Sequence, residues 1–367
     1  MLAACFASSL GFSPSYKVLP TTRLEMATWS DSKAVKDYQD FLASGRQEIE
    51  RKPDGPSVII RPFDGQGSTV LADALVAMGM GDDIVVTPDV EGLPESLGGK
   101  TEYPIYITLP PTQIENFIKD APWCFKERND DYVFFSGGLQ YGNIEDVLKE
   151  KGYCRDSMTQ VLITGLELTP GGVKDLSIKL GADAMGAEKL AGECAACGKW
   201  NGAIAERLEK NNIRCLVDFY REWRRRMWEC NVMDAVFHLV GAVRTQETNL
   251  KDVAKYYSEE VSDMVWQTSG CLRGWKALTL TYGVEERIFG IAENTGSSKP
   301  CILVDEMYPY IWGNRVFTEG KMFLEYLWYA KEECGLLQSV ELPRKRNVDE
   351  ESRQIMREGV MRADGKI

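Results

Sequence analysis

The first residues with a pattern suited to chemistry are two glycines, Gly65-x-Gly67, between a short apolar run and the apolar segment "LADALVAMG". In a dinucleotide-binding turn, the first glycine permits the tight turn and the second lets the backbone approach the pyrophosphate at a helix N-terminus. Val70 stands where a third small residue is expected, and Asp64 adds negative charge. The pattern predicts a cofactor site for NAD or NADP that includes Gly65, Gln66 and Gly67, or a relic of such a site.

A carboxylate that binds a ribose is expected about 20 residues after such a turn. The sequence offers Asp89 there, and no Lys or Arg lies between 87 and 91 to receive a 2′-phosphate. This favours NAD over NADP. A polar loop at the end of a strand has the same composition, so both interpretations stand.

The single histidine of the chain, His238, lies four residues after Asp234 in a helical pattern. A spacing of four places two side chains on one helix face, where a carboxylate can position an imidazole as a general acid or base. Cys230 lies one turn earlier on the same stripe. His238, Asp234 and Cys230 are therefore the candidate catalytic residues; alternatively, His238 is a core residue hydrogen-bonded to Asp234.

Cys194 and Cys197 form the only CxxC of the sequence. A second cysteine pair or a nearby histidine is missing, so we expect no metal site. A redox pair is one interpretation, and two small, partly buried side chains in a loop is the other.

The elements that must position these residues follow from the hydrophobic pattern. Apolar runs at 57–61, 82–89, 103–111, 130–138 and 159–169 predict strands, and helical spacers separate the earlier ones, as in a parallel sheet with helices on both faces. From about 200 the pattern becomes mostly helical, with one long helix at 219–244. We expect a Rossmann-like α/β domain over 31–217, an all-helical domain over 218–335 and a charged tail over 336–367.

Composition limits the partners. A net charge of −12 argues against nucleic acid and against an anionic membrane, and no apolar run is long enough for a transmembrane helix. Residues 1–30 contain Glu25 as their only acid before Asp31, along with Ser, Thr and Ala, which is typical of an organelle transit segment. We expect removal of this segment on import into a plastid, with the protein in the stroma; the cytoplasm is the alternative.

Several stretches resemble the ketopantoate reductase superfamily, in particular a plant and algal plastid branch without an established activity. They are "CGKWNGAIAERLEKNNIRC", "RRRMWECNVMDAVFHLVGAVR", "VEERIFGIAENTG" and "DDYVFFSGGLQYG". The resemblance covers roughly 55–318 and implies a Rossmann-like domain followed by a helical domain of the ketopantoate reductase or 6-phosphogluconate dehydrogenase type. Thr108, Gly137 and Gly138 complete the expected cofactor site.

The resemblance also shows where this chain departs from the family. Its catalytic lysine corresponds to Cys230, its two following asparagines to Asp234 and His238, and its Asn-Gly turn to Gly137-Gly138. We therefore expect either an NAD(P)-dependent oxidoreductase with a small-molecule substrate other than ketopantoate, or a catalytically inactive plastid pseudoenzyme that binds a nucleotide or a protein partner. A homodimer is the expected assembly.

Overall fold

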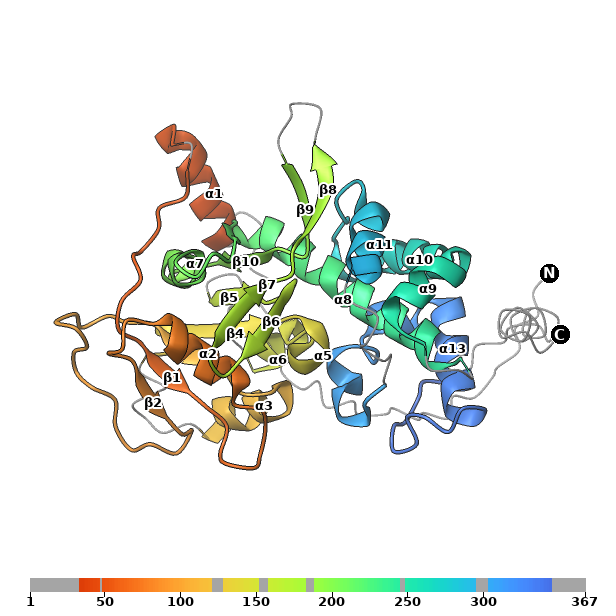
Figure 1. Ribbon diagram of the computed structural model, residues 1–367, viewed down its shortest axis with the longest axis horizontal. Coiled ribbons are helices and arrows are strands. Elements are labelled where there is room, and N and C mark those ends of the chain that lie inside the picture. The colour runs from red at the N-terminus through yellow and green to blue at the C-terminus, as the bar shows by residue number, and fades with distance from the viewer. Residues whose placement is uncertain are drawn as a thin grey trace, which may run out of the picture.

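The computed structural model describes residues 33–46, 48–120, 128–151, 158–182, 188–244, 248–294 and 303–344. The expected targeting segment and most of the expected charged tail lie outside these ranges. A sheet-based half is followed by a helical half, as Figure 1 shows from left to right. The expected fold class, a Rossmann-like parallel sheet followed by an all-helical domain, is confirmed.

Seven strands form the main sheet, in the order β11-β10-β5-β4-β3-β1-β2. Five neighbouring strands are parallel, and β10 runs antiparallel to β5. The bounds are β1 Val58–Ile60, β2 Ile84–Val86, β3 Ile105–Ile107, β4 Tyr132–Ser136, β5 Thr159–Leu162, β10 Cys194–Cys197 and β11 Cys215–Val217. The strand order reverses between β1 and β3, so their carboxyl ends flank the crevice where open α/β sheets bind ligands.

Helices cover both faces of this sheet because its strands are apolar on both sides. Buried residues of α2 (Val70–Met78) and α7 (Asn201–Glu209) pack on one face. Those of α3 (Pro111–Asp120) and α6 (Glu145–Glu150) pack on the other. Short helices α5 (Gly138–Tyr141) and η2 (Asn129–Asp131) lie beside β4, and α1 (Lys33–Ser44) precedes the sheet.

Two hairpins stand between β5 and β10, where sequence analysis expected a single strand over 159–169. They consist of β6 (Leu166–Thr169) with β7 (Gly172–Asp175), and β8 (Ile178–Ala182) with β9 (Glu188–Ala191). The chain leaves the sheet at Gly165, whose φ is +61° and whose Cα faces the backbone of Gly192 so closely that a Cβ would clash. The first hairpin packs on α2 and the second on α11 of the helical half.

The helical half is built around α8 (Tyr220–Ala242), whose buried side chains form the centre of the second core. Its other helices are α9 Leu250–Tyr256, α10 Ser258–Lys276, α11 Val284–Asn294, η3 Asp305–Tyr310, α12 Arg315–Thr318 and α13 Lys321–Glu332. Tyr257 separates α9 from α10. Among the described residues, no helix is long and apolar enough to span a membrane.

A buried carboxylate joins the two halves. Glu145 Oε1 accepts hydrogen bonds from Arg224 Nε and Nη2 at 3.1 and 2.7 Å, and Glu145 Oε2 accepts one from Trp228 Nε1 at 2.7 Å. Next to it, Asp146 accepts hydrogen bonds from Lys276 Nζ at 2.6 Å and Asn314 Nδ2 at 2.7 Å. We call Glu145, Asp146 and these partners the interdomain clamp. It fixes α6 of the sheet half against α8 of the helical half.

A second buried charge network lies at the amino edge of the sheet. The Arg207 guanidinium of α7 is within 3.1 Å of both the Asp54 and Asp83 carboxylates, and all three side chains are sealed from solvent. Asp83 in turn accepts hydrogen bonds from the Ser57 backbone and hydroxyl. This network ties the starts of β1 and β2 to α7, on the edge opposite the expected cofactor site.

Candidate functional site

The predicted cofactor residues gather at one edge of the sheet. Gly65, Gln66 and Gly67 follow β1, Thr108 follows β3, and Gly137 and Gly138 follow β4. Because these strands are parallel neighbours, their carboxyl ends meet at the same edge. The Thr108 hydroxyl donates to Ile60 O at 2.7 Å, and the Gln113 side-chain amide donates to Gln66 O, so the loops after β1 and β3 are bonded together.

The two glycines of the first turn differ in what surrounds them. Gly65 has a φ of +78° and no atom within 4 Å of the position a Cβ would occupy, so its side is open for an approaching ligand. A Cβ at Gly67 would lie 3.3 Å from the Pro62 ring and 3.4 Å from the Pro110 ring. The turn is thus kept tight at Gly67 by packing against the protein's own prolines and is accessible at Gly65.

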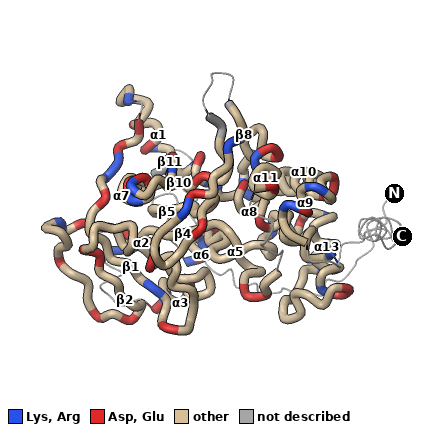
Figure 2. The backbone as a smooth tube through the Cα atoms, viewed as in Figure 1, with Lys and Arg blue, Asp and Glu red and all other residues tan. Residues whose placement is uncertain are grey.

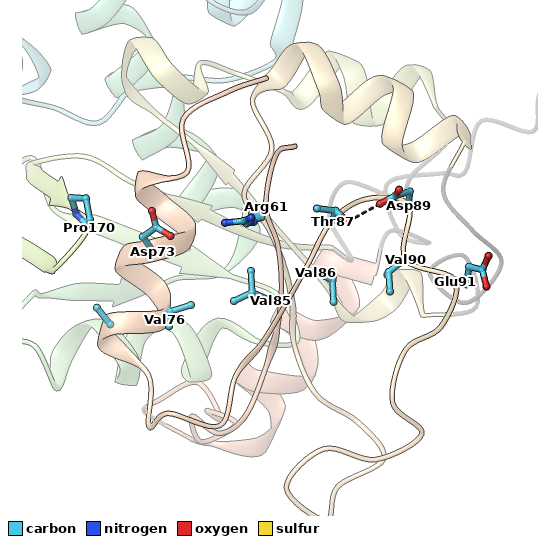
Figure 3. A pocket seen from close by; sticks show the side chains of 11 residues that line it. Arg61, Asp73, Val76, Val85, Val86, Thr87, Asp89, Val90, Glu91 and Pro170 are labelled. Atoms are coloured by element: carbon cyan, nitrogen blue, oxygen red, sulfur yellow. Dashed lines mark hydrogen bonds between the residues drawn. The ribbon is translucent and has the colours of Figure 1, made fainter. Parts of the chain in front are cut away.

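A cavity of about 960 Å³ opens between α2 and the edge strand β2 (Figure 3). Arg61, four residues before Gly65, lines it, whereas Gly65, Gln66 and Gly67 do not. Valine side chains of α2 and β2 supply an apolar wall, and Thr87, Asp89 and Glu91 supply polar groups after β2. The Thr87 hydroxyl donates to Asp89 Oδ1 at 2.6 Å, which holds that carboxylate at the rim. Asp89, the residue expected to bind a ribose, therefore lines a cavity large enough for a nucleoside.

Sequence analysis missed Arg61, the only basic residue among the described residues that line this cavity. Its guanidinium lies between Asp73 of α2 and Thr87 in Figure 3 and forms a 3.1 Å ion pair with Asp64. Asp73 and Pro170, the latter in the turn of the first hairpin, were missed as well. The place of Arg61 directly after the first strand was a usable signal, whereas Pro170 reaches the cavity only through the hairpin's packing on α2.

Cys230 and Asp234 lie beside the second glycine turn. Gly137 and Gly138 have φ values of +111° and +64°, and a Cβ on Gly137 would collide with Ile163 O. Cys230 Sγ donates to Asp234 Oδ2 at 3.6 Å. The Gly138 backbone and the Thr164 side chain lie close enough to the sulfur to offset part of the rise in the pKa of the thiol. Cys230 and its partner Asp234 therefore lie near the turn after β4.

Burial raises the pKa of the Cys230 thiol, and the adjacent Asp234 carboxylate raises it further. The thiol is therefore protonated at neutral pH, since even an exposed cysteine has a pKa near 8.5. A protonated, buried thiol is neither a strong nucleophile nor a cation. It can donate a weak hydrogen bond at the carboxyl edge of β4, but it does not supply the positive charge of a lysine ammonium group.

His238 lies deeper than its two predicted partners. Its side chain is 1% exposed, two turns of α8 beyond Cys230, among buried residues such as Phe237 and Leu239. A general acid or base has to reach the reacting atom directly or through one water. The catalytic role predicted for His238 requires an opening of this region, whereas a core role requires none.

The structure differs from both interpretations of the CxxC. Cys194 and Cys197 belong to the buried strand β10, not to a loop, and their side chains enter the cores on opposite faces of the sheet. Two cysteines on opposite faces of a strand cannot bridge. Burial also raises the pKa of Cys194 to about 12. Neither a redox pair nor a loop is present, and the described residues contain no cluster of ligands suited to a metal ion.

Charge on the molecule is mixed. Lys and Arg residues are interspersed with Asp and Glu over both halves in the view of Figure 2, and no extended basic face is seen there. This distribution agrees with the net charge of −12. An electrostatic footprint for a phosphate backbone would instead gather cations on one face.

Comparison with known proteins gave structural similarities alone. No family model matches the chain, and no curated protein matches it. Solved structures that resemble it include 2-dehydropantoate 2-reductase from Methylococcus capsulatus, with 11% identity, coverage of 84% of this chain and 97% of that one, and a TM-score of 0.43.

Two further similar structures are a second ketopantoate reductase and a D-mandelate dehydrogenase. A dimeric ketopantoate reductase from Staphylococcus aureus shares 9% identity and covers 84% of this chain and 99% of its own, with a TM-score of 0.40. D-mandelate dehydrogenase in complex with NADH shares 12% identity and covers 77% and 99%, with a TM-score of 0.46. At these identities and TM-scores, the function has to be argued from the site of this chain.

Proposed function

We propose that this protein binds NAD(H) in the cavity between α2 and β2, with the adenosine half of the dinucleotide against the apolar wall. The observation that carries this proposal is the arrangement of Arg61, Thr87 and Asp89 around one 960 Å³ cavity. Asp89 accepts hydrogen bonds from the ribose hydroxyls. The valine side chains of α2, of β2 and of the loop after β2 pack against the base. Nicotinamide dinucleotides supply hydride chemistry when bound.

The phosphate part of the site fits less well than the ribose part. Asp64 and Asp73 place negative charge close to the turn, and the Arg61 guanidinium is already paired with Asp64. A pyrophosphate has to compete with the Asp64 carboxylate for that guanidinium. Binding is therefore weaker than in a turn without these carboxylates, and it depends on Arg61.

NADH is expected to bind about tenfold more tightly than NADPH, because the added 2′-phosphate would face Asp89 and Glu91. Titration of the purified protein with each nucleotide, followed by nucleotide fluorescence and thermal midpoint, measures both affinities. Ligand at 100 times its dissociation constant stabilises the fold by about 2.7 kcal/mol. Arg61→Ala should weaken both nucleotides by about tenfold, whereas Asp64→Asn should tighten both by freeing the guanidinium.

Arg46→Ala is the matched control, since Arg46 forms an exposed pair with Glu50 four residues on and does not line the cavity. Its nucleotide affinities should equal those of the wild type. The proposal is wrong if millimolar NADH and NADPH both leave the thermal midpoint unchanged. Equal losses in Arg61→Ala and Arg46→Ala would show that the dinucleotide binds somewhere else.

Two functions remain within this proposal. An oxidoreductase with a substrate other than ketopantoate is supported by the place of Cys230, which donates to Asp234, beside the Gly138 turn. A nucleotide-binding pseudoenzyme is supported by the burial of the Cys230 thiol and of His238. We favour the pseudoenzyme, because Cys230, Asp234 and His238 are all buried and the pKa of the Cys230 thiol is raised.

We propose a plastid location for the protein, on the composition of residues 1–27 alone. These residues lie outside the described part of the chain. Fused to a fluorescent reporter, they should direct it into the stroma. A reporter that stays diffuse in the cytosol, or is secreted, would contradict the proposal, and a reporter fused to residues 33–60 serves as the control.

A further inference from the structure

The outer face of α10 is exposed along its whole length and has an unusual composition. Trp266, at its centre, is 74% exposed. Gly270 and Gly274 follow it at intervals of one helical turn, and no atom lies within 4 Å of where a Cβ would project from either. Glycine lowers the stability of a helix interior by up to about 1 kcal/mol relative to alanine. This face thus combines a protruding indole ring with a strip of bare backbone.

Acidic residues precede Trp266 on this face of α10, and a basic residue follows it. Glu259 and Asp263 precede Trp266 on the same face, and Arg273 follows it. Within the described residues, none of these three side chains forms an ion pair. The opposite face of α10 is fully used, since Val261, Met264, Val265, Thr268 and Leu272 are buried in the helical core. The outer face therefore has no task in folding this half.

We propose that the outer face of α10 binds the same face of a second copy of this chain, with the two helices antiparallel. In that register each Trp266 ring packs on the glycine strip of the other copy, centred at Gly270. The same register places Asp263 of each copy opposite Arg273 of the other. Because a twofold axis relates the two copies, each contact occurs twice in the interface, as in any isologous dimer.

Charge and shape both select a second copy over an unrelated partner. The outer face carries Glu259 and Asp263 in its first half and Arg273 near its end, so reversing the helix places Asp263 of one copy opposite Arg273 of the other. Glycine lets helix backbones approach more closely than larger residues do, and an indole fills the space beside such a strip. A 19-residue helix is about 28 Å long. One helix pair is smaller than a standard interface of about 1,600 Å², so we expect a micromolar dimer.

The mass of the purified full-length protein, measured by sedimentation or light scattering between about 1 and 100 µM, should change from monomer to dimer. Trp266→Ala should weaken the dimer by at least about tenfold. Tyr282→Ala is the matched control, because Tyr282 is an aromatic residue of the same half with 99% exposure. It should leave the dimer unchanged. Circular dichroism and nucleotide affinity should be the same for both variants.

Charge reversal tests the register. Asp263→Lys and Arg273→Glu should each weaken the dimer by at least about fivefold, and the double variant should restore it, since the pairs are re-formed with exchanged signs. A protein that stays monomeric at 100 µM overturns the proposal. So does a dimer that Trp266→Ala leaves intact, or a double variant as weak as the single ones. Because nucleotide affinity is measured separately, failure here is distinct from failure of the cofactor site.

Discussion

Purified protein mixed with ketopantoate and either NADPH or NADH is expected to turn over at less than about 0.1 per second. Typical enzymes turn over at about 10 per second, and a positioned general acid contributes about 100-fold to 10,000-fold. From the sequence resemblance to ketopantoate reductases, we expect Cys230 to occupy the position of their catalytic lysine. Reduction of the ketone needs a proton donor for the developing alkoxide, and here that position holds a buried thiol whose pKa is raised.

A ketopantoate reductase assayed at the same enzyme concentration gives the reference rate. Residual activity, if present, should not follow the titration of a lysine, and Cys230→Ala should leave it unchanged within a factor of about two. A turnover near 10 per second would falsify the assignment of Cys230 to the lysine position. It would also mean that another side chain reaches the substrate.

The second large effect concerns the interdomain clamp. Replacement of Glu145 by Ala should lower the free energy of unfolding by about 3–5 kcal/mol, because it leaves the buried Arg224 guanidinium without its carboxylate and removes the acceptor of Trp228 Nε1. For a protein of this size the thermal midpoint should fall by about 4–6 °C. Calorimetry or denaturant titration measures the loss.

Asp146→Ala provides the matched control one residue further along α6. Its carboxylate also pairs across the two halves, with Lys276, but it is 44% exposed. Exposed ion pairs contribute about 0–1 kcal/mol, so this variant should stay within about 1 kcal/mol of the wild type. Equal losses in the two variants would show that burial of Glu145 is not what makes the clamp strong.

The sequence predicted the parallel core of the sheet well, because β1, β3 and β4 are apolar runs between helical spacers. It failed between β5 and β10. The cysteine strand 194–197 contains only small residues and lacks the branched and aromatic side chains that mark a strand. Its structure depends on pairing with β5 and β11, which lie far away along the chain. Such long-range pairing leaves no local pattern.

The candidate site shows the same limit at the level of single residues. The glycines and Asp89 could be placed because their spacing from strand ends reflects local geometry. Arg61 was missed, since its relevance depends on the side chains of α2 and of the loop after β2 that surround it. For His238, spacing gave the correct helix face but not the depth. The burial of a side chain on α8 depends on how α9, α11 and α13 cover that helix. The sequence of α8 alone does not contain this information.

The paired hairpins between β5 and β10 have a mechanical consequence. One of them rests on α2 beside the nucleotide cavity and the other on α11, so a single insertion of the chain touches both halves. The close contact of Gly165 with Gly192 ties the two ends of this insertion together. Any rotation of the helical half must therefore drag the second hairpin and pull on the first.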